Sequence, residues 1–129
     1  MDDRAKDLSG YRLSQAEETL KVAENCLRDG FYKDAINRSY YAAFYAVKAI
    51  LALEKVDFKR HKDVIGHFNL HYVKEDLFPR NIGRDLGRLK QIREKSDYDD
   101  FFVASQSQAE EQVSYAKEIV TAIREYLKI

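Results

Sequence analysis

The stretch that decides the fold is residues 40–53, YYAAFYAVKAILAL, in which Lys48 is the one charged side chain. Its apolar residues cover most of the circumference of a helix, and a helix that is apolar nearly all round lies among other helices. The run is shorter than the roughly 18 apolar residues that indicate a membrane span. It therefore predicts a central helix that Asp34 caps and that ends at about Leu53.

Apolar residues recur at helical spacing on both sides of this stretch. Before it, they predict a helix over residues 8–28, which Gly30 ends in the left-handed conformation. After it, they predict three further helices, over residues 63–73, 82–95 and 105–127. Strand-like alternation, internal repeats and low-complexity tracts are absent from the sequence. We predict an all-α fold, an up-and-down helical bundle of four to five helices, as a single domain over residues 1–129.

Composition supports a folded, helical protein. The 129 residues are 45% hydrophobic and 34% charged with a net charge of zero, which excludes a disordered chain. A chain of this length buries about two-thirds of its surface without a disulfide or metal. The single cysteine, Cys26, excludes an internal disulfide framework. The first residues, MDDRAKD, are polar and acidic rather than typical of a secretory signal, so we expect a cytoplasmic protein with no membrane partner.

The net charge of zero hides a division along the chain. Residues 31–95 carry a net charge of +6, and the two ends together carry −6. If the terminal helices pack together, the molecule has a basic side and an acidic side. Solvated helix faces with internal ion pairs explain this pattern, and so does a basic surface for phosphate or nucleic acid. The sequence leaves both interpretations open.

The central helix carries charges on one face. Arg38, Tyr41, Tyr45 and Lys48 share that face by their spacing. A cation on a largely buried helix needs water, a carboxylate or a phosphate, because an unpaired buried charge is costly. Arg38 therefore pairs with an internal acid, or this face forms a cleft or a dimer seam. The helix has more apolar surface than a small bundle covers, so we expect a homodimer.

A second polar group lies at the end of the helix over residues 82–95. Arg93 falls at the edge of the inward face, and Asp97 and Tyr98 follow in an expected break over residues 96–102. An ion pair between Arg93 and Asp97 that locks this turn is one interpretation. A fixed catalytic network is the other.

The histidines favour phosphate over metal. His67, His71 and Glu75 have the spacing of a zinc site, but Glu75 lies beyond the expected helix end. The HExxH pattern is absent because position 68 is Phe. We therefore predict no metal and no cofactor. His61, among neighbouring cations that include Lys62, is placed to act on a phosphate instead.

Four motifs occur in a fixed order along the chain. They are Arg38-Ser39-Tyr40-Tyr41-Ala42-Ala43-Phe44, His61-Lys62, Phe68 with Val73-Lys74, and Arg93 followed by Asp97-Tyr98. In this order the chain resembles the HEPN family, in particular the stand-alone prokaryotic proteins with an Arg-x-Tyr-Tyr-Ala-x-Phe signature. The resemblance covers about residues 8–127.

The resemblance implies a five-helix bundle that forms a homodimer with a cleft at the interface. HEPN proteins are often encoded beside a minimal nucleotidyltransferase, as toxin and antitoxin, and many are metal-independent ribonucleases with an Arg-x(4–6)-His motif. Because Arg38 and Arg93 lie at the edges of inward helix faces, we expect Arg38, Arg93, Asp97 and Tyr98 to converge on one site near the dimer axis, with His61 and Lys62 at its rim. In this site the catalytic group is Arg93 with Asp97 and Tyr98, and the nucleotide- or RNA-binding group is Arg38, Tyr41, His61 and Lys62.

The sequence departs from the ribonuclease motif after Arg93. The positions where the histidine would stand are occupied by Tyr98, Asp99 and Asp100. A tyrosine pKa near 10 makes Tyr98 a poor general base, although a tyrosine near this motif receives nucleotide monophosphates in some partners of nucleotidyltransferases. We therefore expect an RNA or nucleotide binder with weak or no nuclease activity. The alternatives are a metal-independent ribonuclease toxin and a non-catalytic helical adaptor.

Overall fold

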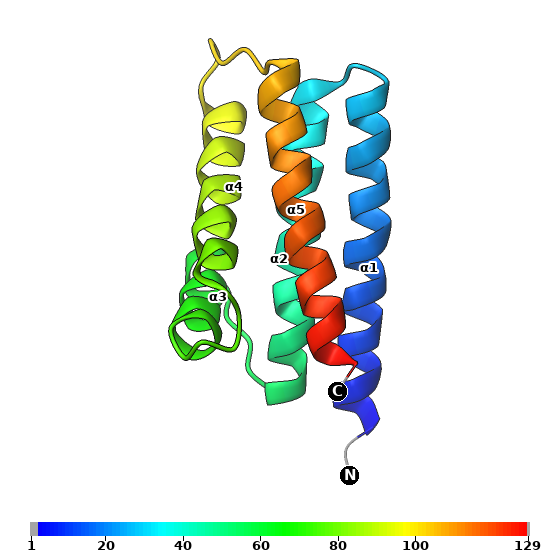
Figure 1. Cartoon of the computed structure of the whole chain (residues 1–129), viewed down its shortest axis with the longest axis vertical. Helices are drawn as coiled ribbons and strands as arrows, with labels where there is room; N and C mark the ends of the chain where they lie inside the picture. Colours follow the sequence, from blue (N-terminus) through cyan, green and yellow to red (C-terminus); the bar gives the residue numbers. More distant parts are fainter. Residues whose placement is uncertain (1–2, 129) are drawn as a thin grey trace.

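The computed structural model describes residues 3–128 and shows only helices and connecting segments in that range. They are α1 (Asp3–Arg28), α2 (Tyr32–Glu54), α3 (His61–Phe68), the π-helical turn η1 (Asn69–Val73), α4 (Arg80–Tyr98) and α5 (Gln106–Leu127). Figure 1 shows α1, α2, α4 and α5 running along the long axis as an up-and-down bundle. The predicted all-α fold of four to five helices is confirmed.

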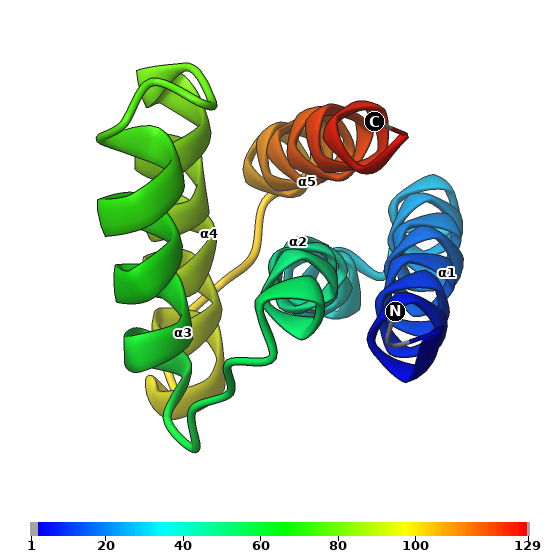
Figure 2. The same ribbon diagram turned by 90° about the horizontal axis from the view of Figure 1, so that it is seen from below.

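The central position of α2 is also confirmed. It contacts α1, α3, α4 and α5. Seen along the bundle in Figure 2, α1 lies on one side of α2, α3 and α4 lie on the opposite side, and α5 lies between them. Thirteen residues of α2 are buried, and they come from nearly every turn of the helix. Each large apolar side chain buried in this way stabilises the fold by about 1.5–3 kcal/mol.

The terminal helices α1 and α5 pack together, which was the condition for a basic and an acidic side. α1 contacts α5, so the acidic ends of the chain lie beside each other in space. The basic middle of the chain comprises α2 at the centre of the bundle together with α3 and α4 on the side away from α1 (Figure 2).

Several helix ends differ from the predicted ones. α2 begins at Tyr32, so Asp34 lies within its first turn, and Phe31 at the N-cap makes no side-chain cap. The prediction of an Asp34 cap is therefore wrong. α3 begins at His61, two residues earlier than expected. Gly30 has a φ of 84°, which confirms the left-handed end of α1.

α4 packs closely against the segment that follows α3. A Cβ added at Gly83 of α4 would lie 2.9 Å from Asn69 Oδ1 and 3.2 Å from a methyl carbon of Val73. Only a residue without a side chain allows the α4 backbone to approach η1 this closely. This approach helps to hold α3 and α4 together on one side of α2.

Candidate functional site

Arg93 lies on the inward face of α4, where its guanidinium packs against two tyrosine rings of α2. Its side chain is 10% exposed, and Cζ lies 4.7 Å from the ring centroid of Tyr40 and 5.5 Å from that of Tyr41. Its Nε is buried and has no hydrogen-bond partner among residues 3–128. A buried cation with an unused donor favours the approach of an anion.

The ion pair between Arg93 and Asp97 spans one turn of α4. Arg93 Nη1 donates a hydrogen bond to Asp97 Oδ2 over 3.2 Å. Because α4 continues to Tyr98, the pair lies within the helix, and the predicted break that begins at Ser96 is wrong. Burial alone would lower the pKa of Arg93, but the hydrogen bond to Asp97 and the nearby tyrosines outweigh it and raise the pKa. Asp97 therefore holds Arg93 both charged and oriented.

His61, the first residue of α3, inserts its imidazole into the same cluster. The ring stacks on Phe44 with the two centroids 4.1 Å apart. It also meets Tyr41 in an edge-on arrangement at 5.9 Å. His61 Nδ1 lies 2.9 Å from the hydroxyl oxygen of Tyr40. Two rings of α2 and one hydroxyl thus fix the imidazole beside the tyrosines on which Arg93 packs.

The surroundings of His61 are predominantly cationic. Burial lowers the pKa of His61 below its ordinary value of 6.5. The positive charges of Arg93, Lys48 and Lys90 lower it further, and the carboxylate of Glu94 only partly opposes them. These surroundings therefore favour the neutral form of the imidazole.

Arg38 joins the cluster through the ring of Tyr41. Its Cζ lies 5.2 Å from the Tyr41 centroid, so this ring is shared with Arg93. The Arg38 guanidinium donates two hydrogen bonds to the neutral side-chain oxygen of Asn37, over 3.0 and 2.7 Å. In the described part of the chain it pairs with no carboxylate, and the interpretation of Arg38 as half of an internal ion pair is wrong. Two arginines on one ring attract an anion from outside.

The structure brings together five of the seven predicted site residues. They are Arg38, Tyr41, His61, Arg93 and Asp97. Lys62 is exposed, and within residues 3–128 it makes no hydrogen bond or ion pair with these five residues. Tyr98 is 79% exposed and makes no hydrogen bond or ring contact with Arg93 or His61 within residues 3–128. We refer to Arg38, Tyr40, Tyr41, Phe44, His61 and Arg93 as the Arg93 cluster.

Two members of the Arg93 cluster were not identified as site residues from the sequence. Tyr40 and Phe44 share the apolar stripe of α2, and periodicity alone indicates burial for both. Tyr40 is indeed fully buried, yet its hydroxyl faces His61. A polar atom on a core side chain is the one signal in the sequence that could have singled it out.

The other histidines form a separate cluster at the far end of α3. His67 Nε2 lies 3.1 Å from Glu54 Oε2, and the ring of His71 lies 4.4 Å from that of His67. The hydroxyl of Tyr72 donates to the second oxygen of Glu54. Across residues 3–128, no group of three or more His, Cys, Asp or Glu side chains has the geometry to hold a metal ion.

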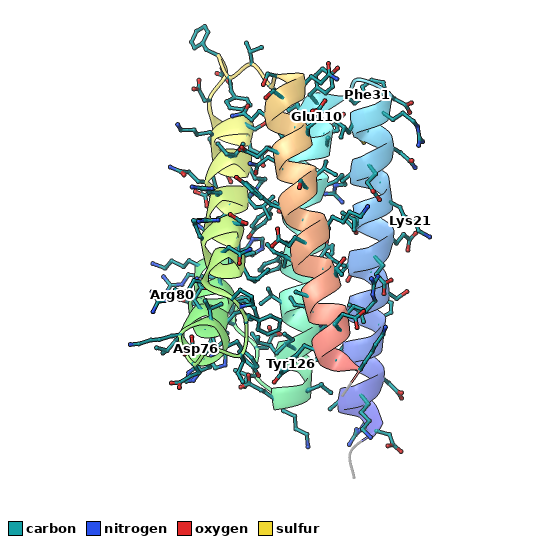
Figure 3. All side chains as sticks on the ribbon, viewed as in Figure 1. Lys21, Phe31, Asp76, Arg80, Glu110 and Tyr126 are labelled. Atoms are coloured by element: carbon teal, nitrogen blue, oxygen red, sulfur yellow. The ribbon has the colours of Figure 1, made fainter. Side chains whose placement is uncertain are left out.

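Two further surface features lie away from the Arg93 cluster. A hollow of about 560 Å³ is lined mainly by α1 and the C-terminal turns of α2 and α5, and it includes Tyr126, at the lower end in Figure 3. At the opposite end, marked by Phe31, the loop after α4 exposes 92% of Phe101 and 85% of Val103. The hollow has one cation in its lining, Lys6, and neither feature has the two arginines and the imidazole that distinguish the Arg93 cluster.

Comparison with known proteins identifies the family. A family model described as HEPN domain matches residues 9–126. The chain belongs to the HEPN domain family. The archaeal HEPN homologue ST0689 superposes with a TM-score of 0.71 at 21% identity, over 92% of this chain and 96% of that one. The HEPN domain protein tm0613 of Thermotoga maritima has a TM-score of 0.69 at 21% identity, over 92% and 98%. These structures confirm the HEPN fold.

Proteins related in sequence carry descriptive names, but these names assign no role to individual residues. "Putative toxin MJ0605" of Methanocaldococcus jannaschii is 36% identical over 83 residues, which span 64% of this chain and 62% of that protein. A UPF0332 protein of Thermotoga maritima is 27% identical over 99% of this chain and 96% of its own length. No helix within residues 3–128 of the HEPN chain is long and apolar enough to cross a membrane.

Proposed function

We propose that this HEPN protein binds the phosphate of RNA or of a nucleotide at the Arg93 cluster, with weak or no nuclease activity. The observation that carries the proposal is the buried Arg93 guanidinium, whose Nε has no partner although the side chain is 10% exposed. The positive charge of this guanidinium and that of Arg38, which shares the Tyr41 ring with it, would attract a phosphate.

The biological setting that we propose is a toxin–antitoxin-type pair in the cytoplasm. Relatives named as toxins support this setting. The partner we propose is a protein with a minimal nucleotidyltransferase domain, as the resemblance to stand-alone HEPN proteins implies. We also propose a homodimer; light scattering at micromolar concentrations should give about twice the monomer mass of 15.1 kDa. A mass equal to that of the monomer at all these concentrations would contradict it.

A metal-independent ribonuclease is the second candidate function. The favouring observation is that His61 packs on the same tyrosines as Arg93, so a histidine reaches the arginine from another helix. In such an enzyme the imidazole would take the 2′-hydroxyl proton, and Arg93 would stabilise the charge on the pentacoordinate phosphorus. Incubation of single-stranded RNA with the protein and a chelator distinguishes the two candidates, since only the enzyme would yield cyclic phosphate ends.

The test of binding uses labelled single-stranded oligouridylate and adenosine monophosphate (AMP). We expect Arg93→Gln to weaken binding by about tenfold or more, because a hydrogen bond to a charged group contributes about 1.5–3 kcal/mol. Arg38→Gln should act in the same direction. Affinity for the RNA should fall between about 50 and 200 mM salt as counterions are released.

Arg88→Gln is the matched control on the same helix. Arg88 is about half exposed and donates to the Tyr115 hydroxyl of α5 over 3.1 Å, away from the Arg93 cluster. We expect its removal to leave both affinities unchanged. If the wild-type protein binds neither probe, alone or with its partner, the adaptor interpretation replaces this proposal.

A further inference from the structure

The hydroxyl of Tyr40 determines which nitrogen of His61 carries the proton. Tyr40 is fully buried, and its hydroxyl oxygen lies 2.9 Å from His61 Nδ1 and within reach of the Arg93 guanidinium, which can only donate a hydrogen bond to it. Burial is the main cause that raises the pKa of Tyr40 to about 12, so the hydroxyl keeps its proton. A buried hydroxyl needs an acceptor for its hydrogen, and an unprotonated ring nitrogen is one. Tyr40 therefore donates to Nδ1, and the single proton of a neutral imidazole is on Nε2.

The charges that face His61 favour this neutral form. Arg93 and Lys90 of α4 and Lys48 of α2 are the cations that act on it, and Glu94 of α4 is the opposing carboxylate. Lys48 and Lys90 have carboxylate partners of their own, Asp57 at 3.4 Å and Glu94. Within residues 3–128, His61 Nε2 makes no hydrogen bond. The free N–H group is thus an unused donor on a ring that packs on the same tyrosines as Arg93.

We propose that His61 binds the phosphate as a neutral donor, through Nε2–H, and that Tyr40 is the positioning residue that fixes this tautomer. The proposal rests on the proposed function and names the groups that would hold the ligand: Nε2–H of His61 together with the guanidinium of Arg93. The ligand class is a phosphate monoester or diester of a ribonucleotide.

The same tautomer explains why the protein would bind RNA or a nucleotide but cleave RNA weakly or not at all. In the Nε2–H form the outward nitrogen has no lone pair with which to take the proton of a 2′-hydroxyl. A switch to the other tautomer would leave the buried Tyr40 hydroxyl facing an N–H group, without its acceptor. His61 thus occupies the place of a general base but is held in the donor form.

Nuclear magnetic resonance of nitrogen-15-labelled full-length protein tests the tautomer directly. Long-range correlations at about pH 7.5 should show the Nε2–H form for His61, assigned with His61→Gln. Tyr40→Phe keeps the ring and removes the hydroxyl, so we expect a mixture of tautomers and a roughly three- to tenfold loss of AMP affinity. A purely structural role for Tyr40 would leave the tautomer unchanged. His67 and His71 serve as internal controls.

A titration with AMP and with adenosine tests the contact. AMP should shift the Nε2 and Nε2–H signals of His61, and adenosine, which lacks the phosphate, should not. An Nδ1–H form or a charged imidazole in the free protein would overturn the proposal. Binding of AMP without a shift at His61 would overturn it as well, but would leave the proposed function intact. Absence of binding by AMP and by oligouridylate alike would overturn both.

Discussion

His61 and His67 stand at the two ends of the same short helix, and their surroundings are opposite in charge. His61 faces a hydroxyl and several cations, which together with burial lower its pKa. His67 instead faces the carboxylate of Glu54 at 3.1 Å, and that carboxylate also accepts a hydrogen bond from Tyr72. In this second cluster, at the far end of α3, the side chains of His67 and Tyr72 hydrogen-bond to Glu54. The Arg93 cluster, in contrast, retains unused donors and positive charge. The difference indicates a structural role for the far cluster and a ligand role for the Arg93 cluster.

The largest expected effect is on the ring that organises the Arg93 cluster. Tyr40 is fully buried and packs against Tyr41, Phe44 and His61. We expect Tyr40→Ala to lower the free energy of unfolding by about 3–5 kcal/mol, because it leaves a cavity the size of an aromatic ring. Chemical denaturation measures this, and a loss below about 1 kcal/mol would show that the ring does not anchor the cluster.

Glu54→Gln tests how much the hydrogen bonds to Glu54 in the cluster at the far end of α3 stabilise the fold. Burial would raise the pKa of Glu54, but the hydrogen bonds from Tyr72 and His67 outweigh it and hold the pKa below 4.5. The stabilisation is therefore present above about pH 4.5 and is lost as the pH falls through the lower, folded value.

At neutral pH we expect Glu54→Gln to cost about 1–3 kcal/mol of unfolding free energy, as for a hydrogen bond to a charged group. The wild-type advantage should shrink in acid, and denaturant melts at a series of pH values measure it. An advantage that does not change with pH would contradict the assignment, and AMP affinity should be unchanged by this substitution.

His61→Gln tests the opposite end of the helix by its pH dependence. Because the pKa of His61 is lowered in the folded protein, the unfolded chain binds the proton first as the pH falls below 6.5. The wild-type protein should therefore lose stability from about pH 6.5 downward, and His61→Gln should lose less over that interval. If the two curves run parallel between pH 7 and 5, the cationic surroundings of His61 are not as described.

The smallest expected effect concerns Tyr98. Its side chain is 79% exposed, so Tyr98→Phe should change the unfolding free energy by no more than about 0.5 kcal/mol. Because Tyr98 lies outside the Arg93 cluster, AMP affinity should also be unchanged. A loss of affinity comparable with that of Arg93→Gln would move the binding site toward the end of α4.

Much of the fold was predictable because α2 is apolar nearly all round. That property places other helices on every side of it, and it follows from residues 40–53 alone. The convergence of Arg38 and Arg93 was also predictable, since each falls at the edge of an inward helix face. Cations at the edges of two inward helix faces come close together where these two helices pack against each other.

The position of His61 was not predictable in the same way. It depends on the path of residues 55–60 and on the start of α3 at His61, and neither leaves a periodic pattern in the sequence. Tyr98 shows the converse: its closeness to Arg93 in sequence suggested a shared site. The continuation of α4 and the exposure of its last turn carry Tyr98 into solvent.

A crystal structure with adenosine 5′-monothiophosphate tests the central claim most directly, because the anomalous signal of its sulfur marks the position of the phosphorus group. The account predicts a sulfur peak within contact distance of the Arg93 guanidinium, with a thiophosphate oxygen accepting from His61 Nε2. It also predicts that Arg93→Gln crystals lose the peak. A peak in the hollow beside Tyr126, or at the exposed loop after α4, with the Arg93 cluster unchanged, would contradict the account.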